Sequence, residues 1–582
     1  MKFRSAKTKV RYLLLLLVIS LIQFWAIPSA NAATVGSGIC QQTYTFSAGS
    51  ESVTVTSEGN YCYVAFKNLG AAGSASSSYT WTKPSGITSL DVLVIGGGGG
   101  GGARHGGGGG AGSFVQTTSY PVASASTNVS IVVGSGGAGA VGGSTSYIGS
   151  KGNDSSFKVG ANGLTALGGG GGINGTSSTV NGGSGGGAGF NQTAGTATTS
   201  TQKTLDGVTT LSGIEFGNAG AFGTQDLNTG TSSSYDFWAA GGGGGAGGAG
   251  KRPSLNGSEY TAQTYFPDGT GSGTRGGDGG AGKVSSIIST TVATALSIGQ
   301  NSAGSVYFAA GGGGGIGADG DSGGTGGIGG GGNGTKAIAS GGVAAVVSTG
   351  SGGGGSGFDD ISPAAGDVQN PPGGAGASGV VLIRYIPPAP TISSSATISG
   401  TTTYGQSLSS TTGVWNNIPS TYSYQWLRAT TAGGTYASIA GANSSTYTLA
   451  SADVGQYIKV AVTATNVGGS TTDTSTATSV VASLTSSTSV SLDVGNLFFR
   501  TTKIISATPT VAGKLTFRAN NVIIPGCKNL STNANTLRTC SYRPNTRGPI
   551  VISVTLAPTD SGYAGNTTQT GSYFVYSRSG SR

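Results

Sequence analysis

The chain has few of the side chains that carry enzyme chemistry. Only 8% of its 582 residues are charged, and it contains a single histidine, His105. A histidine-based triad needs a nucleophile and an acid held beside the ring, and no spacing pattern links His105 to such partners. The 20 acidic residues show no pairing pattern that would identify a glycosidase. We therefore expect no catalytic residues and a protein that is not an enzyme.

Nucleotide, metal and nucleic-acid motifs are also lacking. The glycine-rich segments have no Gly-Lys-Ser/Thr ending, which a phosphate-binding loop requires. Asp319, Asp321, Asp359 and Asp360 lie near glycines, but without the nonapeptide repeat that binds calcium. No nucleic-acid-binding motif is recognisable. The sequence thus predicts no cofactor, no metal ion and no nucleic-acid partner.

Only the N-terminus has a long apolar stretch. Residues 13–24 are apolar, and they follow five basic residues, Lys2, Arg4, Lys7, Lys9 and Arg11. Ala30-Asn31-Ala32 fits a small-x-small cleavage site. A membrane anchor is the alternative, although the stretch is short for a span. We expect a signal peptide over residues 1–32 and a secreted or extracellular cell-surface protein, with no transmembrane segment after cleavage.

Cysteine is scarce, and its four positions form two distant pairs. Cys40 and Cys62 lie near the start of the chain, whereas Cys527 and Cys540 lie near its end. In an exported protein the economical connectivity is two local disulfides, Cys40–Cys62 and Cys527–Cys540. Zinc binding is the alternative, but no histidine has ligand spacing to these cysteines.

Glycine is the residue that the chain has in excess. It contains 114 glycines, and the runs 96–102, 168–172, 241–245 and 311–315 recur roughly every 70 residues. Three of the runs follow apolar or aromatic residues, as in Val92-Leu93-Val94-Ile95. A strand that leads repeatedly into glycine indicates an architectural repeat, whereas flexible linker is the alternative. Ordering glycine is costly relative to alanine, so such runs would be ordered only if several of them packed together.

The motifs around these runs resemble a known family. They are the opening Thr80-Trp81-Thr82-Lys83-Pro84-Ser85-Gly86-Ile87, the segments 92–96, 106–112 and 132–134, and the closing Gly379-Val380-Val381-Leu382-Ile383-Arg384-Tyr385. Together they resemble the bacterial and phage glycine-rich domain family. They are also similar in style to phage tail-tip adhesins and to the ectodomain of anaplastic-lymphoma-kinase-type receptors. The resemblance covers roughly residues 78–386 and implies a β-sandwich with inserted polyglycine-II-like helices. We expect this glycine-rich domain to span residues 33–387.

Two further segments have the character of β-sandwiches. Residues 388–483 include Tyr422-Ser423-Tyr424-Gln425-Trp426-Leu427, which alternates like a central strand with a buried tryptophan. This segment resembles bacterial immunoglobulin-like repeats. Residues 484–582, with the strand Ile550–Leu556 and the second cysteine pair, look like another immunoglobulin-like type. The expected fold is therefore mainly β, with the glycine-rich domain followed by two immunoglobulin-like sandwiches.

The functional prediction is an adhesin-like display protein. Loops between glycine runs are the candidate binding surface, with Arg104, His105, Phe237 and Trp238 as its residues, and His105 is expected at an exposed loop tip. Residues 484–582 carry ten Lys/Arg and two Asp/Glu. This balance could attract anionic wall polymers, and ordinary solvated surface charge is the alternative. Surface glycans are the other candidate partner. A purely structural envelope component and a secreted hydrolase with accessory domains remain alternative functions.

Overall fold

The computed structural model shows a chain that is mainly β, as predicted. It describes residues 31–35, 40, 42–46, 51–125, 127–142, 147–174, 182–189, 215–225, 238–255, 258–259, 274–317, 322–336, 341–358, 371–492 and 496–577. The predicted signal peptide lies outside these residues, except that Asn31 and Ala32 begin strand β1. None of the described helices is long and apolar enough to cross a membrane. The chain forms two compact units, residues 1–388 and 389–582.

Unit 1 (residues 1–388) is built on two antiparallel six-stranded sheets. The first sheet contains, in spatial order, β1 (Asn31–Val35), β2 (Gln42–Phe46), β5 (Ser77–Lys83), β8 (Thr127–Val133), β9 (Ser155–Val159) and β10 (Asn162–Ala166). The second contains β11 (Glu215–Phe216), β7 (Phe114–Pro121), β6 (Ser89–Ile95), β20 (Val380–Tyr385), β4 (Tyr61–Asn68) and β3 (Glu51–Glu58). The closing strand β20 thus lies between β4 and β6, in the middle of its sheet.

The central strands of the second sheet are buried on both faces. In β6, Val92 and Val94 join the cluster between the two sheets, whereas Leu93 and Ile95 join a second cluster on the opposite face. Because successive side chains of a strand point to opposite faces, a continuous apolar run is what such a strand requires. The runs Val92–Ile95 and Val380–Tyr385 both satisfy this requirement.

A short helix and a small sheet cover the outer face. Helix α2 (Thr290–Leu296) places Val292 and Leu296 in the second cluster. Its N-cap Ser289 accepts a hydrogen bond from the backbone N–H of Val292, at 3.1 Å. At the other end, the buried Lys67 donates its Nζ proton to the carbonyl of Leu296, at 2.8 Å, where a cation offsets the helix dipole. The adjoining sheet contains β17 (Lys283–Val284), β19 (Ser305–Phe308) and β18 (Gln300–Ser302).

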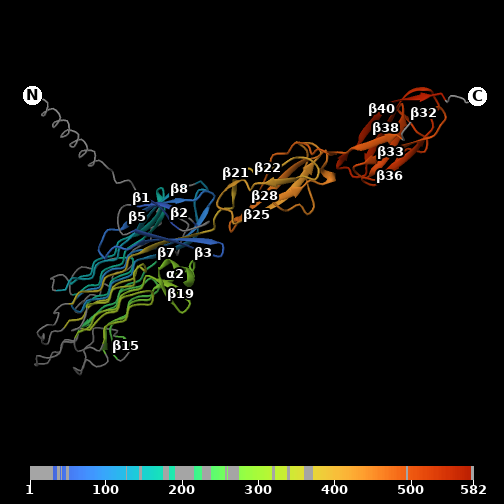
Figure 1. Ribbon diagram of the computed structural model, residues 1–582. Coiled ribbons are helices and arrows are strands. Elements are labelled where there is room, and N and C mark those ends of the chain that lie inside the picture. The colour runs from blue at the N-terminus through green and yellow to red at the C-terminus, as the bar shows by residue number, and fades with distance from the viewer. Residues whose placement is uncertain are drawn as a thin grey trace, which may run out of the picture. The chain divides into compact units, whose positions relative to one another are not determined.

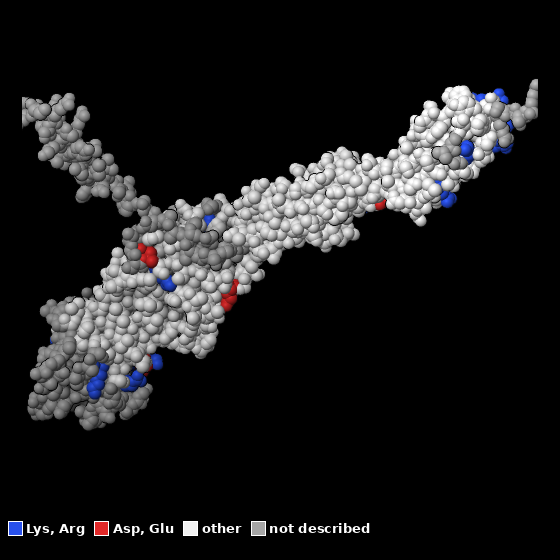
Figure 2. All heavy atoms as spheres, viewed as in Figure 1, with Lys and Arg blue, Asp and Glu red and all other residues white. Residues whose placement is uncertain are grey.

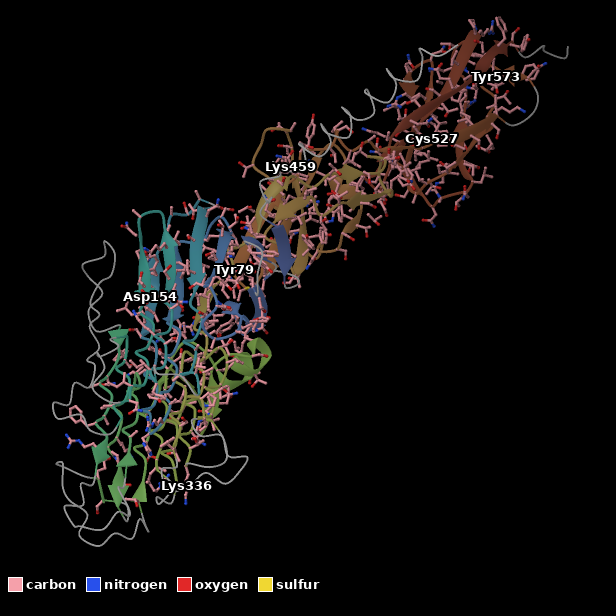
Figure 3. The ribbon with its side chains drawn as sticks, turned by 90° about the vertical axis from the view of Figure 1, so that its left-hand side faces the viewer. Tyr79, Asp154, Lys336, Lys459, Cys527 and Tyr573 are labelled. Carbon is pink, nitrogen blue, oxygen red and sulfur yellow. A yellow bond between two sulfur atoms is a disulfide. The ribbon has the colours of Figure 1, made fainter. Side chains whose placement is uncertain are left out.

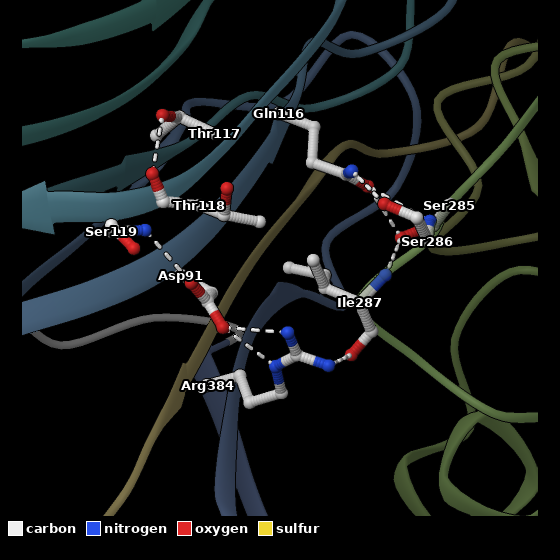
Figure 4. A network of polar contacts seen from close by, with 9 residues as sticks. All are labelled: Asp91, Gln116, Thr117, Thr118, Ser119, Ser285, Ser286, Ile287 and Arg384. Atoms are coloured by element: carbon white, nitrogen blue, oxygen red, sulfur yellow. Dashed lines mark hydrogen bonds and ion pairs between the residues drawn. The ribbon is translucent and has the colours of Figure 1, made fainter.

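A polar network ties this cover to the sheet (Figure 4). The Arg384 guanidinium on β20 donates from Nε and Nη2 to Asp91 Oδ2 on β6, at 2.8 and 2.7 Å. Its Nη1 donates to the Ile287 carbonyl, just before α2, and the other oxygen of Asp91 accepts from the Ser119 N–H. Since both ends of the ion pair are largely buried, the pair fixes the segment before α2 against the sheet.

The glycine runs extend from the sheets of unit 1 as a bundle of side-by-side segments, with β15 at the far end (Figure 1). Their backbone groups bond to one another with a period of three. Along the first run, Gly96, Gly99 and Gly102 donate to Ser113, Gly110 and Gly107; Gly97, Gly100 and Ala103 donate to Asn153, Ser150 and Tyr147; Gly98 and Gly101 donate to Ala377 and Gly374. Successive residues therefore face three different neighbouring segments in turn.

The Cα atoms of the same run also pack against three further segments of the bundle. A Cβ atom built at Gly98 would lie 1.9 Å from the carbonyl oxygen of Ser351, and one at Gly97 would lie 2.0 Å from that of Ser135. Gly99 approaches Gly170 as closely. Non-bonded carbon and oxygen atoms do not approach each other to this distance, so none of these three positions can carry a side chain without moving its neighbours. The runs are buried among themselves, and their lack of side chains is what permits the spacing.

The bundle also contains short strands. They are β12 (Thr224–Gln225) with β13 (Trp238–Ala239), and β15 (Ser258–Glu259) with β14 (Ser254–Leu255) and β16 (Thr274–Arg275). Each spans two residues, so most of the backbone pairing in the bundle is between segments outside strands.

Unit 2 (residues 389–582) contains two separate hydrophobic clusters. Trp426, Val460 and Leu408 belong to the first cluster, and Phe517, Ile552 and Leu556 belong to the second. Around the first lie β21 (Thr391–Ser394) with β24 (Val414–Asn416); β22 (Ile398–Ser399), β23 (Ser407–Ser410) and β27 (Thr446–Thr448); the 3-10 helix η3 (Ser451–Asp453); and β26 (Ala437–Ser438), β25 (Thr421–Ala429), β28 (Tyr457–Asn466) and β29 (Gly469–Thr474). The strictly alternating burial along β28 is that of a strand with one face on the core.

The second cluster of unit 2 has three sheets around it. They contain β30 (Leu484–Thr485) with β39 (Tyr563–Ala564); β31 (Thr488–Leu492), β33 (Lys503–Pro509) and β37 (Arg538–Tyr542); and β32 (Leu497–Phe498), β40 (Asn566–Tyr576), β38 (Gly548–Pro558), β34 (Gly513–Ala519) and β35 (Val522–Ile523), with β36 (Leu530–Thr532) also on β34. The predicted boundary between residues 388–483 and 484–582 stays a prediction.

Two disulfides join the four cysteines. Cys40 pairs with Cys62 in unit 1, and Cys527 pairs with Cys540 in unit 2, with Cα–Cα distances of 5.4 and 5.8 Å. This is the local pairing that the spacing predicts. The first bridge joins the residue Cys40, before β2, to β4, and the second joins the turn after β35 to β37.

Candidate binding surfaces

The predicted binding residues Arg104 and His105 form a tight turn between two glycine runs. Both residues have left-handed backbone conformations, with φ of 52° and 57°. The turn is closed by a hydrogen bond from the Gly102 N–H to the Gly107 carbonyl, at 2.9 Å. A left-handed conformation costs a non-glycine residue on the order of 1 kcal/mol, so the side chains must supply compensating contacts.

Arg104 makes these contacts with two aromatic rings. Its guanidinium carbon lies 4.6 Å from the ring centre of Phe358 and 5.4 Å from that of Tyr147. Its Nη1 also donates to the Tyr147 hydroxyl, at 3.3 Å. A guanidinium between two rings gains cation–π attraction from each, roughly 0.5–1 kcal/mol at an exposed site and more where water is excluded. These contacts hold Arg104 in place.

His105 lies beneath the surface, which corrects the expectation of an exposed loop tip. Its side chain is only 2% exposed, and its ring meets Phe358 edge-on, with ring centres 5.6 Å apart. Nε2 lies 3.2 Å from the Phe358 carbonyl, so it carries the donated proton. Burial lowers the pKa of the ring to about 3, although the bond to the carbonyl opposes this, and the nearby Arg104 lowers it further. His105 is therefore neutral near pH 7, and packing against Phe358 explains why the residue turns inward.

The other predicted binding residues are only partly described. Phe237 lies outside the described residues. Trp238 begins β13, where its backbone pairs with Gln225. The polar and ring contacts of Arg104 go to Tyr147 and Phe358, so this side chain does not join the turn to β13. A binding role for these residues stays a prediction.

A group of charged residues at the bundle was missed by the sequence analysis. Asp278 forms ion pairs with Lys251 and Arg275, and the nitrogen–oxygen distance is 3.8 Å in each. The Arg275 Nε also donates to the Ser322 hydroxyl, and Arg252 lies over the Phe222 ring. Figure 3 places Lys336 toward the same end of unit 1, away from the large sheets. In a chain with so little charge, the sequence signal for this group was Lys251-Arg252 directly after a glycine-rich segment, with Arg275 and Asp278 on either side of Gly276-Gly277.

No grouping of three or more His, Cys, Asp or Glu side chains suited to a metal ion occurs in the part of the chain that the structure describes. Some of the described carboxylates pair with basic groups, as Asp91 does with Arg384 and Asp453 with Arg428.

One comparison with known proteins supports a glycine-rich domain in unit 1. Residues 73–209 match a family model described as a glycine-rich domain. The matched stretch begins before β5 and runs through the first glycine runs, including the Arg104–His105 turn. No curated protein matches the chain. The chain is thus similar to glycine-rich domains over part of unit 1.

Proposed function

We propose that the protein is an exported, non-enzymatic cell-surface or secreted protein that displays binding loops on a rigid glycine scaffold. In this proposal the glycine runs are polyglycine-II helices, which are threefold and bond only to their neighbours. The threefold change of hydrogen-bond partner along Gly96–Gly102 is the observation that supports it. Such a bundle holds its loops in fixed positions, whereas a flexible linker would not.

The partners proposed for these loops are glycans or other cell surfaces. Neutral side chains dominate the bundle, and they bind sugars through hydrogen bonds and aromatic contacts rather than through charge. Segments around Phe237-Trp238 supply an aromatic pair, and the ends of the runs supply Lys251 and Arg275. Unit 2, with its proposed immunoglobulin-like domains, would act as a spacer and a wall-proximal module.

A glycan array and a whole-cell adhesion assay on the full chain test this function. We expect binding to a defined set of glycans, and a loss of about tenfold or more for the double variant Phe237→Ser/Trp238→Ser, because buried aromatic contacts dominate interface energies. Val522→Ser, at an exposed residue of unit 2, is the control and should bind as the parent chain does.

The same assays separate this proposal from a purely structural role. If the chain binds no glycan and no cell, and a deletion strain loses envelope integrity without a change in adhesion, the protein is a structural envelope component. Sugar release from the array would instead point to a hydrolase.

A further inference from the structure

The end of unit 2 is strongly basic over the residues that the structure describes. The described residues from 484 to 577 contain eight Lys/Arg and one acidic residue, Asp560. Asp560 is itself engaged by the Tyr404 hydroxyl, at 2.6 Å. Figure 2 shows basic atoms near the end of unit 2 where β32 and β40 lie in Figure 1. A positive surface of this kind attracts anions.

Two of these arginines lie over the ring of one phenylalanine, and a third is hydrogen-bonded to the backbone beside it. The guanidinium carbons of Arg500 and Arg547 each lie 5.1 Å from the ring centre of Phe499. Arg543 donates from Nε to the Arg500 carbonyl, at 2.7 Å, and the Arg500 N–H donates to Pro544. We call Arg500, Arg543 and Arg547 the arginine cluster. All three are exposed, and none forms an ion pair with a described carboxylate.

Exposed aromatic rings adjoin the cluster. Phe574 and Tyr576 are 52% and 45% exposed, and they project from the same face of β40, with ring centres 5.1 Å apart. Phe498 on β32 continues the row, 6.3 Å from Tyr576. The backbone N–H of Phe499 donates to the Tyr576 carbonyl, so the aromatic row and the cluster meet at Phe499. Aromatic rings that are held in place and exposed to water can pack against the apolar surface of a ligand.

We propose that the arginine cluster and the aromatic row together bind a phosphate-bearing surface polysaccharide. Each guanidinium presents a planar fork of N–H donors that matches the oxygens of a phosphate. The rings would pack against the apolar faces of the sugars between phosphates. The proposal deepens the proposed function, since it rests on the chain being at the cell surface, and it gives unit 2 a partner of its own.

The test uses the full chain and fluorescent glycosylated poly(glycerol phosphate) as the probe. The variant Arg500→Gln/Arg543→Gln/Arg547→Gln removes the cluster. The matched control, Lys514→Gln/Lys528→Gln/Arg538→Gln, removes the same charge from elsewhere in residues 484–577. We expect the cluster variant to bind about tenfold more weakly or worse, because charge-assisted bonds are lost, and the control to bind within about threefold of the parent chain. Equal losses in both variants would overturn the site.

Two further variants keep the proposal testable if the triple glutamine variant does not fold. Arg500→Lys/Arg543→Lys/Arg547→Lys keeps the charge and loses the fork, so we expect intermediate binding; binding equal to that of the parent chain would count against arginine recognition. Phe574→Ser/Tyr576→Ser should weaken binding about threefold or more while the salt dependence remains. Circular dichroism checks the fold of each variant.

The choice of probes decides the class of partner. Dextran, which is neutral, should not bind, and polygalacturonate, which carries carboxylates, should bind more weakly than the phosphate polymer. Equal or tighter binding of oligothymidylate, or of phosphatidylglycerol vesicles without the polymer, would assign the surface to another ligand and overturn the proposal. Failure here with intact glycan-array binding by the full chain would leave the proposed function standing.

Discussion

The glycine bundle of unit 1 and the sheets of unit 2 exclude water in opposite ways. In unit 2, large side chains such as Trp426 and Phe517 fill the space between sheets. In the bundle, backbones lie so close that a Cβ at Gly98 would overlap the Ser351 carbonyl. One region is stabilised by side-chain volume and the other by its absence. The two should therefore respond oppositely to changes in residue size.

The largest effect is expected from the removal of volume in unit 2. Trp426 is fully buried, and its Nε1 donates to the Ser444 carbonyl, at 2.9 Å. Trp426→Ala should lower the free energy of unfolding by about 4 kcal/mol, because it leaves a cavity and an unbonded carbonyl. Urea unfolding measures the loss of free energy, with hydrogen exchange used to monitor each unit separately. Trp426→Phe is the milder control, and a loss below about 1 kcal/mol for Trp426→Ala would contradict the comparison.

A smaller loss is expected when volume is added to the bundle. Gly98→Ala places a methyl group 1.9 Å from the Ser351 carbonyl oxygen, so neighbouring runs must separate, at a cost of about 3 kcal/mol. Gly248→Ala is the matched control, because its Cβ would meet nothing closer than 3.6 Å, and it should change stability by less than about 1 kcal/mol. Thermal unfolding of both variants gives the answer. Equal stabilities would show that the runs are not packed as described.

The smallest effect is expected from protonation of His105, the one histidine, whose large side chain is buried in the bundle. Its pKa of about 3 lies below the unfolded value of about 6.5. The stability that this difference contributes is fully present above pH 6.5 and is lost as the pH falls toward 3. Between pH 7.5 and 5 the parent chain should lose about 2 kcal/mol more than His105→Asn, which does not titrate.

The direct measurement is an NMR titration. Because His105 is the only histidine, its ring protons are easily assigned, and they should not shift between pH 8 and about 4.5. A midpoint near 6.5 would place the ring in water and restore the exposed loop tip that the sequence predicts.

Patterns within single strands were predictable, whereas packing between runs was not. The apolar stretches Val92–Ile95 and Val380–Tyr385 indicated buried strands because their composition alone demands burial on both faces. The glycine runs are nearly identical in sequence, so nothing local distinguishes one neighbour from another. Their partners are set by how the strands and turns at each end align the runs.

Other misses have physical causes of the same kind. Helix α2 contains three threonines and a valine among seven residues, which are poor helix formers, and it forms because Val292 and Leu296 have an apolar face to cover. His105 was expected at the surface because the ring that buries it, Phe358, lies 253 residues away in sequence. Tertiary packing decides both positions.

The central position of β20 in its sheet has a consequence for biogenesis. Asp91 and Arg384, neighbours in the folded sheet, are separated by 293 residues, and every glycine run lies between them. During synthesis β4 and β6 would wait with their inner edges unpaired, which is the condition that invites aggregation. The sheet can therefore be completed only after residues 380–385 have been synthesised, and a chain that ends before Val380 would lack the strand that joins β4 to β6.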